Sequence, residues 1–426
     1  MIDTKTAIEK ITNGEFDNLF TDIYIDSSMI DYQKKRYVHA IEQYETIFCP
    51  DKVAIFSAPG RSEVCGNHTD HQHGMVLATS INLDTIAVSA KNNNDVVRFV
   101  SDGYDMITLN INDLEVNDDE AGTTVSLIRG VLRGLKDHGY KIGGFNAYAT
   151  SDVLVGAGLS SSAAFEVVVG TIISGLYNDM KINSVEIAQI SQYAENVFFK
   201  KPCGLMDQMA CSVGGMVNID FKDPTKPIVK KVHTEFEKYD YSLCIVDTKG
   251  DHVDLTDDYA MIPSEMKKVA NFLGEDYLRD CDSNEFYIRL DEIREAVGDR
   301  PVLRAIHFFN EEYNVKNAVS SLENGKFVEF LDAIRKSGNS SFKYLQNVYT
   351  TRDIQHQNIS VALALSESLL RNYGVCRVHG GGFAGTIQAF VKNDFVSNYK
   401  EFINKIFGEN SCHVLKVRKY GGIKVM

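Results

Sequence analysis

The sequence predicts an α+β fold with two domains, and three observations support this. The 426 residues are enough for two hydrophobic cores. Segments with a two-residue apolar period are mixed with longer segments of helical spacing, but not in a regular strand–helix–strand repeat. The chain has no internal repeat, low-complexity tract or flexible linker. We therefore expect two halves that share a large interface, with the functional site between them.

The N-terminal part is predicted to be helical up to about residue 50. Apolar side chains recur there at helical spacing, at Ile8, Ile11 and Phe16 and again at Tyr37, Ile41, Tyr44 and Ile47. This extension is either a packed cap or an oligomer contact, and the sequence does not decide between the two. From Val53 the apolar period shifts towards two. That period predicts strands over 53–56, 85–89 and 96–100, with a turn at 91–95.

The remaining elements follow from the same patterns. Helices are predicted over 124–138, 163–178 and 187–200, and a strand over 241–246. The region from 260 to 371 is predicted to be mostly helical. Strands at 386–391 and 414–417 are predicted to end the chain in a short β unit.

Composition excludes several classes of protein. The formal net charge of −14 disfavours a nucleic-acid partner, because phosphates would be repelled. The eight cysteines are scattered without a Cys-x-x-Cys pair, which is typical of reduced thiols. No basic region followed by an apolar run begins the chain, and no apolar stretch has membrane-spanning length. We expect a cytoplasmic protein without a membrane partner, of undetermined oligomeric state.

The most informative segment is Val155-Gly-Ala-Gly-Leu-Ser-Ser-Ser-Ala163, which leads directly into a predicted buried helix. Free N–H groups and the positive end of the helix dipole suit such a loop to binding phosphate. It is not a Walker loop, because the Gly-Lys-Ser/Thr ending is missing. Taken alone, a serine-rich helix start is more often a simple N-cap.

Three further segments add to this loop. They are Ser57-Ala-Pro-Gly-Arg-Ser-Glu-Val-Cys-Gly-Asn-His-Thr-Asp-His-Gln-His-Gly74, Cys203-Gly-Leu-Met-Asp-Gln208 and His379-Gly-Gly-Gly-Phe-Ala-Gly-Thr386. In this order and spacing, the four blocks resemble the signature motifs of the GHMP small-molecule kinases. Within that superfamily they are most similar to those of the galactokinases, and the similarity extends from about Phe56 to the end of the chain.

The resemblance implies a two-domain fold and a reaction. The expected architecture is a helical extension over 1–50, a ribosomal-protein-S5-like domain over 51–225 and a ferredoxin-like domain over 226–426. The expected activity is ATP- and Mg²⁺-dependent phosphorylation of a small sugar, galactose, at its anomeric hydroxyl. Two alternatives stay open, the same chemistry on galacturonate or another hexose and a non-catalytic sugar and ATP sensor. The retained serines at 160–162 disfavour the sensor.

The resemblance also assigns the reacting groups. Asp207 is expected to orient the hydroxyl and accept its proton late, and Arg61 to stabilise charge at the transferring phosphoryl group. Ser162 and Glu195 are the expected magnesium ligands. The residues expected to hold the ATP phosphates are Gly156, Ala157, Gly158, Leu159, Ser160, Ser161 and Ser162, with Gly381 and Gly382 from the last block.

The predicted sugar contacts include two departures from the family pattern. His68, Asp70, Gly204 and Tyr259 match sugar-contacting positions, and Asn67 joins them. Asn67 replaces the usual glutamate, and His71 replaces the usual tyrosine. An amide both donates and accepts hydrogen bonds, whereas an ionised carboxylate only accepts. Asn67 therefore either weakens galactose binding or admits an acidic sugar such as galacturonate.

Two smaller points complete the expectations. His68, His71 and His73 invite a metal-site interpretation, but a zinc site needs further ligands and a supporting shell that the sequence does not supply. In the last block, Ala384 stands where the family has glycine. It is expected to be strained if that position requires a positive φ.

Overall fold

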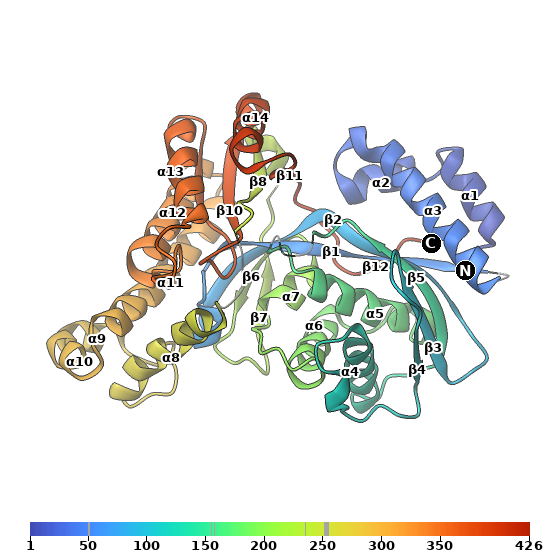
Figure 1. The fold of residues 1–426 in the computed structure, drawn as a ribbon, viewed down its shortest axis with the longest axis horizontal. Helices are drawn as coiled ribbons and strands as arrows, with labels where there is room; N and C mark the ends of the chain where they lie inside the picture. Colours follow the sequence, from blue (N-terminus) through green and yellow to red (C-terminus); the bar gives the residue numbers. More distant parts are fainter. Residues whose placement is uncertain (50–51, 155, 157, 235, 251–254) are drawn as a thin grey trace.

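The computed structural model describes residues 1–426 except 50–51, 155, 157, 235 and 251–254. Its strands form an eight-stranded sheet and a four-stranded sheet, with helices packed around both (Figure 1). Neighbouring strands are antiparallel apart from the parallel pair β3–β5. The predicted α+β class is confirmed.

Three helices form the N-terminal extension, α1 (Thr4–Thr12), α2 (Asp17–Tyr24) and α3 (Ile30–Phe48). They lie together on one face of the larger sheet (Figure 1). Phe20 and Tyr37 of these helices share a hydrophobic core with Ile86 and Val88 of the sheet. The extension is thus a packed cap, as one of the two sequence alternatives proposed.

The larger sheet is built on two long strands. They are β1 (Ala54–Cys65) and β2 (Met75–Lys91), and every residue of β1 is buried. The predicted strands at 53–56 and 85–89 are parts of these. The first predicted strand ended at Phe56 because Pro59 and Gly60 normally interrupt a strand. β1 continues through these two residues, where the pairing with β2 shifts its register. The other members are β3 (Val96–Ser101), β4 (Ile107–Asn110), β5 (Phe145–Ser151), β6 (Met216–Asp220), β7 (Ile228–Lys231) and β12 (Ile423–Lys424).

Four helices cover the opposite face of this sheet (Figure 1). They are α4 (Thr124–Asp137), α5 (Ser161–Tyr177), α6 (Ser184–Tyr193) and α7 (Met206–Val213). A π-helical turn, Ala194–Phe198, follows α6, so the predicted helix over 187–200 is two elements. α5 is buried nearly all round, which explains why its sequence is apolar without a clear polar face.

The second sheet has the order β11-β8-β10-β9. Its strands are β8 (Tyr241–Asp247), β9 (Gly374–Val378), β10 (Thr386–Lys392) and β11 (Cys412–Leu415). The helices around it are α8 (Thr256–Phe272), α9 (Ser283–Ile288), α10 (Leu290–Val297), α11 (Asp299–Glu323), α12 (Phe327–Ser340), α13 (Asn358–Leu370) and α14 (Val396–Phe407). The predicted helical region is confirmed, and the predicted strand at 414–417 lies at 412–415.

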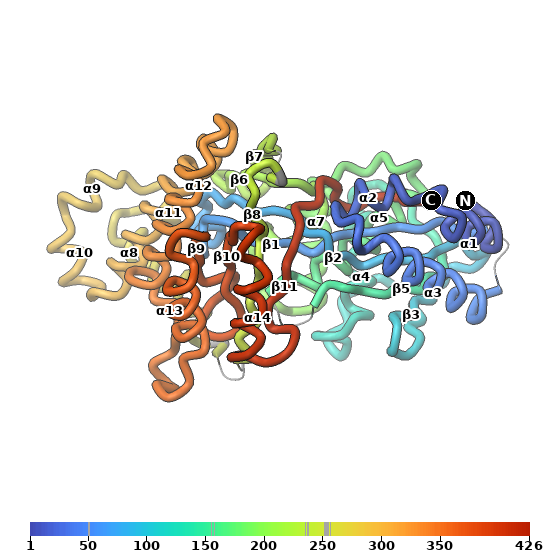
Figure 2. Tube along the Cα trace, turned by 90° about the horizontal axis from the view of Figure 1, so that it is seen from above, coloured from blue at the N-terminus to red at the C-terminus, as the bar shows by residue number. Residues whose placement is uncertain are grey.

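After β11 the chain returns to the first sheet. The Asn82 N–H donates to the Lys416 carbonyl at 3.1 Å, and the Val425 N–H donates to the Ile55 carbonyl at 2.7 Å. β12 pairs with β1. Figure 2 shows this last segment running from the second sheet towards the N-terminal helices. The division into domains at 50/51 and 225/226 stays a prediction.

A buried ionic cluster holds the cap, the sheet and the returning segment together. Asp84 of β2 binds the Arg36 guanidinium at 2.7 Å and the Arg418 guanidinium at 2.9 Å. Tyr24 and Ser57 donate hydrogen bonds to the same carboxylate. Burial raises the pKa of Asp84, but the two arginines outweigh it and hold the pKa below its usual range.

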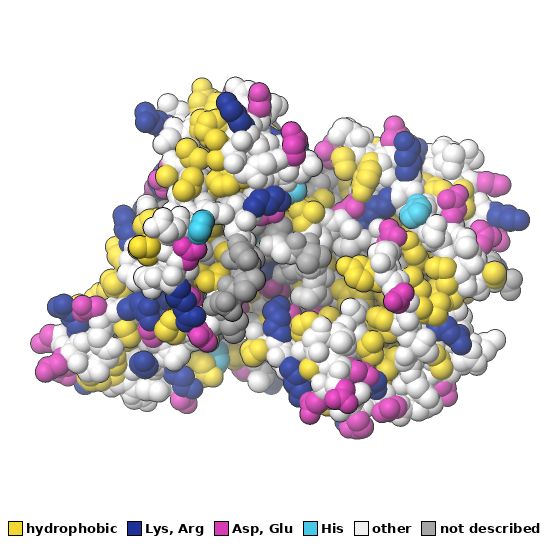
Figure 3. All heavy atoms as spheres, in the orientation of Figure 1, with side chains coloured by type: hydrophobic (Ala, Val, Ile, Leu, Met, Phe, Trp, Pro, Cys, Tyr) yellow, Lys and Arg dark blue, Asp and Glu magenta, His cyan; other side chains and the backbone are white. Residues whose placement is uncertain are grey.

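The surface and the thiols fit an ordinary globular protein. On the face in Figure 3, the described basic and acidic side chains are interspersed rather than gathered into one basic surface. All eight cysteines are free thiols. Among the residues that the structure describes, the helices are all too short or too polar to cross a membrane.

Candidate active site

The centre of the site is an ion pair between Arg61 of β1 and Asp207 at the start of α7. Nε of Arg61 donates to Oδ1 of Asp207 at 2.7 Å, and Nη2 donates to Oδ2 at 2.7 Å. This two-point contact fixes the carboxylate plane. Nη1 of Arg61 donates to the Gly158 carbonyl, and the Ser160 hydroxyl donates to Asp207. The two predicted catalytic residues thus meet at the predicted phosphate loop.

Asp207 is a carboxylate at neutral pH. Burial raises its pKa, but the Arg61 charge and the hydrogen bonds from Arg61 and Ser160 outweigh burial and hold the pKa below its usual range. Its side chain is 30% exposed, so a ligand can reach it.

The phosphate loop enters α5 through backbone turns that few residues adopt. Gly156 and Gly158 have φ of +80° and +66°. Ser160, the N-cap, has a φ of +58°, and α5 begins at Ser161. Leu159 is fully buried and accepts a hydrogen bond from the Arg61 N–H at 3.1 Å. Of the predicted phosphate-binding residues, Ala157 lies outside the part of the chain that the structure describes.

The last glycine block lies against this loop. A Cβ on Gly158 would come within 3.0 Å of the Thr386 hydroxyl and 3.2 Å of Nδ1 of His379, so glycine permits the approach. Burial lowers the pKa of His379 well below its usual value. The neutral ring bonds Thr386 through one nitrogen and Ser62 through the other, each at 3.0 Å.

Within that block, the non-glycine residue with a positive φ is Phe383 and not Ala384. Gly382 and Phe383 have φ of +83° and +57°, whereas Ala384 is not among the positive-φ residues. The condition for strain at Ala384 is therefore not met. Phe383, which matches the family pattern, takes the left-handed conformation instead.

The two predicted magnesium ligands are neighbours. The Ser162 hydroxyl donates to Oε1 of Glu195 at 3.1 Å, and Glu195 projects from the π-helical turn after α6. Hydroxyl and carboxylate oxygens are the donors that Mg²⁺ prefers, so the pair fits the ion. The Lys201 ammonium lies 2.8 Å from the same Oε1, where a cation would stand.

Sequence reasoning missed the residues that support Glu195. Nε2 of Gln208 donates to Oε2 of Glu195 at 2.7 Å and to Oε2 of Glu166 at 3.1 Å. Burial and the nearby Glu195 raise the pKa of the fully buried Glu166 well above its usual value. Gln208 stands inside a quoted motif block and was open to prediction. Glu166 and Lys201 have no such signal.

Replacing Lys201 with methionine is expected to strengthen the binding of Mg²⁺ at its two predicted ligands, Ser162 and Glu195. The change removes the Lys201 ammonium from Oε1 of Glu195, so the lysine no longer competes with Mg²⁺ for this oxygen. An ion pair of this exposure contributes about 1 kcal/mol, so the Mg²⁺ concentration for half-maximal ADP binding is expected to fall about fivefold. Calorimetric titrations of ADP at increasing Mg²⁺ measure this. Lys200→Met, which alters the neighbouring exposed lysine, is the control, and equal Mg²⁺ dependence in both variants would contradict the prediction.

The predicted sugar contacts come together around two loops. Nε2 of His68 lies 3.0 Å from the Gly381 carbonyl, and the Tyr259 hydroxyl donates to the Gly382 carbonyl at 2.9 Å. Burial and the adjacent His71 lower the pKa of His68 to about 3, so its ring is neutral and Nε2 is the donor.

Gly204 and Asp70 form the other side. A Cβ on Gly204 would stand 1.9 Å from Oδ2 of Asp70, so this approach requires glycine. Gly204 lies in the same motif block as Asp207. Asp70 and His68 lie in the turn between β1 and β2, where His68 has a φ of +59°.

Replacing Gly204 with alanine is therefore expected to raise the KM for the sugar. The new methyl group must push Asp70 from its position, which costs the hydrogen bond that this carboxylate would accept from a ligand. Hydrogen bonds to charged groups contribute about 1.5–3 kcal/mol, so the KM is expected to rise at least about tenfold. The KM for ATP and the melting temperature serve as controls. An unchanged sugar KM would contradict the proposed contact.

Asn67 lies differently from the expectation. Its side chain is fully buried, and Nδ2 donates to the two oxygens of Glu63 at 3.0 and 3.2 Å and to the Gly380 carbonyl at 2.7 Å. Its Oδ1 accepts from Asn347 at 2.8 Å. No exposed atom of Asn67 offers the predicted sugar contact in this arrangement.

The position of Asn67 also explains why an amide suits it. A glutamate at 67 would set its carboxylate against that of Glu63, which already pairs with the buried Arg377 at 2.5 Å. Asn67 is thus matched to Glu63, and the pair acts in the frame that joins β1 to the last glycine block. No sequence pattern marks Glu63 as this partner.

The three-histidine metal site is not formed. The rings of His68 and His71 stack at 5.7 Å between centroids, while His73 stacks on Tyr277 at 3.6 Å. Among the described residues, no group of three or more His, Cys, Asp or Glu side chains is arranged to hold a metal ion.

Comparison with known proteins agrees with this geometry. The GHMP kinases N terminal domain matches residues 126–215, and the galactokinase galactose-binding signature matches residues 42–91. Galactokinase of Limosilactobacillus reuteri (strain DSM 20016) is 29% identical over 381 residues, which cover 86% of this chain and 93% of the relative. Galactokinase of Streptomyces coelicolor is 28% identical over 358 residues, 82% of this chain and 88% of the relative.

Solved structures share the fold. A Lactococcus lactis galactokinase complexed with galactose superposes with a TM-score of 0.76 at 23% identity, over 90% of this chain and 98% of that one. A Methanococcus jannaschii mevalonate kinase gives a TM-score of 0.57 at 17% identity, over 86% of this chain and 98% of that one. Signature, domain and relatives agree: the chain carries the GHMP kinases N terminal domain and the galactokinase galactose-binding signature, and over most of its length it is similar to galactokinases.

Proposed function

We propose that this protein transfers the γ-phosphoryl group of ATP to the anomeric hydroxyl of galactose, giving ADP and galactose 1-phosphate. The observation that carries the proposal is the two-point contact between Arg61 and Asp207, which stands at the phosphate loop. Arg61, with the turn that holds His68 and Asp70, falls within the matched galactose-binding signature over 42–91. The relatives that cover most of the chain are galactokinases.

The residues divide the work as follows. Asp207 accepts a hydrogen bond from the anomeric hydroxyl, orients it towards the phosphate and takes its proton late. The Arg61 charge weakens Asp207 as a base, but a loose transition state needs little activation of the hydroxyl before the phosphoryl group has moved. Arg61 stabilises the charge that develops on that group. Ser162 and Glu195 would hold Mg²⁺, whose charge would offset that of the ATP phosphates.

The position of Asn67 favours galactose over galacturonate as the proposed substrate. The argument for an acidic sugar required that loss of the usual glutamate remove a negative charge from the sugar pocket. Asn67 is enclosed instead, and the Glu63 carboxylate beside it is paired with Arg377, so the exchange leaves the charge that faces the pocket unchanged. The pocket side keeps Asp70, a group suited to sugar hydroxyls rather than to a second carboxylate.

The test is ADP release from Mg-ATP by the purified protein with galactose, N-acetylgalactosamine, glucose, arabinose and galacturonate. Turnover on galactose well above the other four sugars is the expected result. Turnover of galacturonate with no turnover of galactose would overturn the proposed substrate but support the proposed phosphoryl transfer. Silence on all five, with ADP binding intact, would overturn the kinase assignment in favour of a sensor.

A further inference from the structure

One helix of the second half of the chain supports the turn that carries predicted sugar contacts. This turn, residues 66–74, joins β1 to β2 and includes His68; we call it the sugar turn. The helix is α11, and it packs against the ends of both strands. There Val315 of the helix shares a hydrophobic core with Cys65 and Met75, the residues on either side of the turn.

Two glycines allow α11 to approach the sugar turn closely. A Cβ on Gly74 would stand 2.7 Å from Oε1 of Glu312 and 2.8 Å from Cε2 of Phe308. A Cβ on Gly66, which has a φ of +100°, would stand 3.1 Å from Cγ2 of Val315. A side chain at either position would force the helix or the turn to move.

Two carboxylates of α11 hold the ends of the sugar turn. Oε2 of the fully buried Glu311 accepts a hydrogen bond from the Gly66 N–H at 3.0 Å. Oε1 of Glu312 accepts one from the Met75 N–H at 2.5 Å. A buried backbone N–H without a partner costs free energy, so these two contacts fix the place where each strand meets the turn.

His307, one helical turn before Glu311, binds the peptide group that precedes His68. Its ring is fully buried, and burial lowers its pKa below the usual value, so the ring is neutral. Nε2 lies 2.8 Å from the Asn67 carbonyl, and Nδ1 lies 2.9 Å from the Ser340 hydroxyl. Because a carbonyl only accepts, Nε2 carries the proton and Nδ1 accepts from Ser340.

The conformation of His68 explains why this peptide group needs support. His68 has a φ of +59°, in the left-handed region that is disfavoured for residues with a Cβ. Rotation of the peptide group between Asn67 and His68 would relax the backbone. The same rotation would move the His68 ring, whose Nε2 lies 3.0 Å from the Gly381 carbonyl. The hydrogen bond from His307 opposes it.

We propose that His307 is a positioning residue for sugar binding, which holds the Asn67 carbonyl and so keeps the His68 ring among the predicted sugar contacts. The inference rests on the function proposed above, in which His68 contacts the sugar. It adds to the site a residue of α11, which lies outside the four motif blocks of the sequence.

His307→Leu tests this role, because it removes the donor to the Asn67 carbonyl. The KM is measured for whichever of the five sugars the unaltered protein turns over, and it is expected to rise about tenfold, the effect of leaving a buried carbonyl without its partner. The KM for ATP is expected to stay unchanged, since the hydrogen bonds of His307 go to the sugar turn and to α12. His307→Gln, whose amide is a donor, is expected to restore most of the loss.

Amide hydrogen exchange gives a second readout that does not depend on turnover. Residues 66–74 are expected to exchange faster in His307→Leu than in the unaltered protein, because the turn opens more easily, while the rest of the chain keeps its exchange rates. Ser340→Ala is a milder variant that keeps the imidazole but removes its hydrogen bond at Nδ1. It is expected to raise the sugar KM about threefold, and it carries the test if His307→Leu does not fold.

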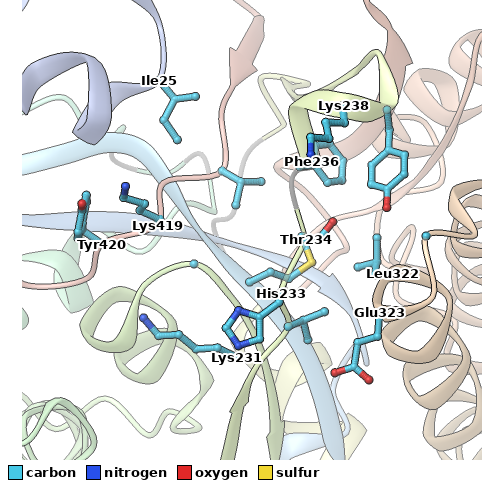
Figure 4. Close-up of a pocket in the computed structure, with 16 residues that line it drawn as sticks. Ile25, Lys231, His233, Thr234, Phe236, Lys238, Leu322, Glu323, Lys419 and Tyr420 are labelled. Carbon is cyan, nitrogen blue, oxygen red and sulfur yellow. The ribbon is translucent and has the colours of Figure 1, made fainter. Parts of the chain in front are cut away.

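Two control variants separate this role from a general loss of stability. Tyr399→Phe removes another buried hydrogen bond, 2.8 Å long and made to Ser366, from the same half of the chain. Glu323→Gln alters the far end of α11, where the side chain lies beside the pocket shown in Figure 4. Both variants are expected to keep the sugar KM and the exchange rates of residues 66–74.

The outcomes distinguish this inference from the proposed function. Normal turnover with an unchanged sugar KM in His307→Leu would overturn only the role of His307. An equal rise in Tyr399→Phe, or equal rises in the KM values for sugar and ATP, would show general destabilisation and overturn it as well. Silence of the unaltered protein on all five sugars would overturn the proposed function and, with it, this role in sugar binding.

Discussion

Asp207→Asn is expected to lower kcat by about 10²–10⁴-fold, the range for loss of a positioned acid–base group. The amide keeps the size of the side chain but cannot take up the hydroxyl proton. Nor can it accept both donors of Arg61 as a carboxylate does. Binding of ATP is expected to persist, because the loop and Glu195 are unchanged. Steady-state ADP release and calorimetric ADP binding separate the two effects.

The control for this variant is Asp223→Asn, which removes the same charge from an exposed loop. It is expected to leave kcat unchanged. A kcat for Asp207→Asn within a few-fold of the unaltered enzyme would exclude Asp207 as the proton acceptor. A parallel loss of ADP binding would indicate instead that the ion pair with Arg61 builds the phosphate loop.

Asp84→Asn is expected to lower the free energy of unfolding by about 3–5 kcal/mol. The substitution leaves the buried guanidinium groups of Arg36 and Arg418 without their shared countercharge. Both arginines are almost fully enclosed, so water cannot replace the carboxylate. The shift of the urea midpoint measures the loss.

The matched control is Glu115→Gln, because Glu115 pairs with Arg133 at the surface with 83% of its side chain exposed. Glu115→Gln is expected to lower the free energy of unfolding by at most about 1 kcal/mol. The pKa of Asp84 is held below its usual range, so its stabilisation is present above about pH 4 and is lost as the pH falls through the folded-state value. The difference in free energy of unfolding between Asp84→Asn and the unaltered protein should therefore become smaller at low pH. A constant difference would contradict the assigned role.

The parts of the fold that could be predicted from sequence are those with a clear period. The N-terminal helices, α4, α5 and β8 lie within a few residues of their expected places. β1 and β2 were predicted too short because they are buried on both faces, which removes the alternation of apolar and polar residues. The short strands β6 and β9 were missed, since their length leaves little pattern.

The candidate site divides in a similar way. Arg61, Asp207, Ser162 and Glu195 were predicted as site residues because each stands in or beside a motif with fixed spacing, and the structure brings them together in pairs. Asn67 was interpreted as a sugar contact because the motif gives position along the chain but not the direction of a side chain. Its partner Glu63 belongs to the same strand and turn, and only the fold shows that the two meet.

The return of residues 416–426 to the first sheet has a consequence for how the chain is made. A ribosome adds about 5–20 residues per second, so β12 and Arg418 emerge roughly 20–70 s after β1. Until then Asp84 lacks one of its two cations, and one edge of β1 has no partner. Until residues 416–426 are synthesised, the first sheet of the nascent chain therefore remains incomplete and β1 keeps one unpaired edge. During that interval it is a natural client for a chaperone.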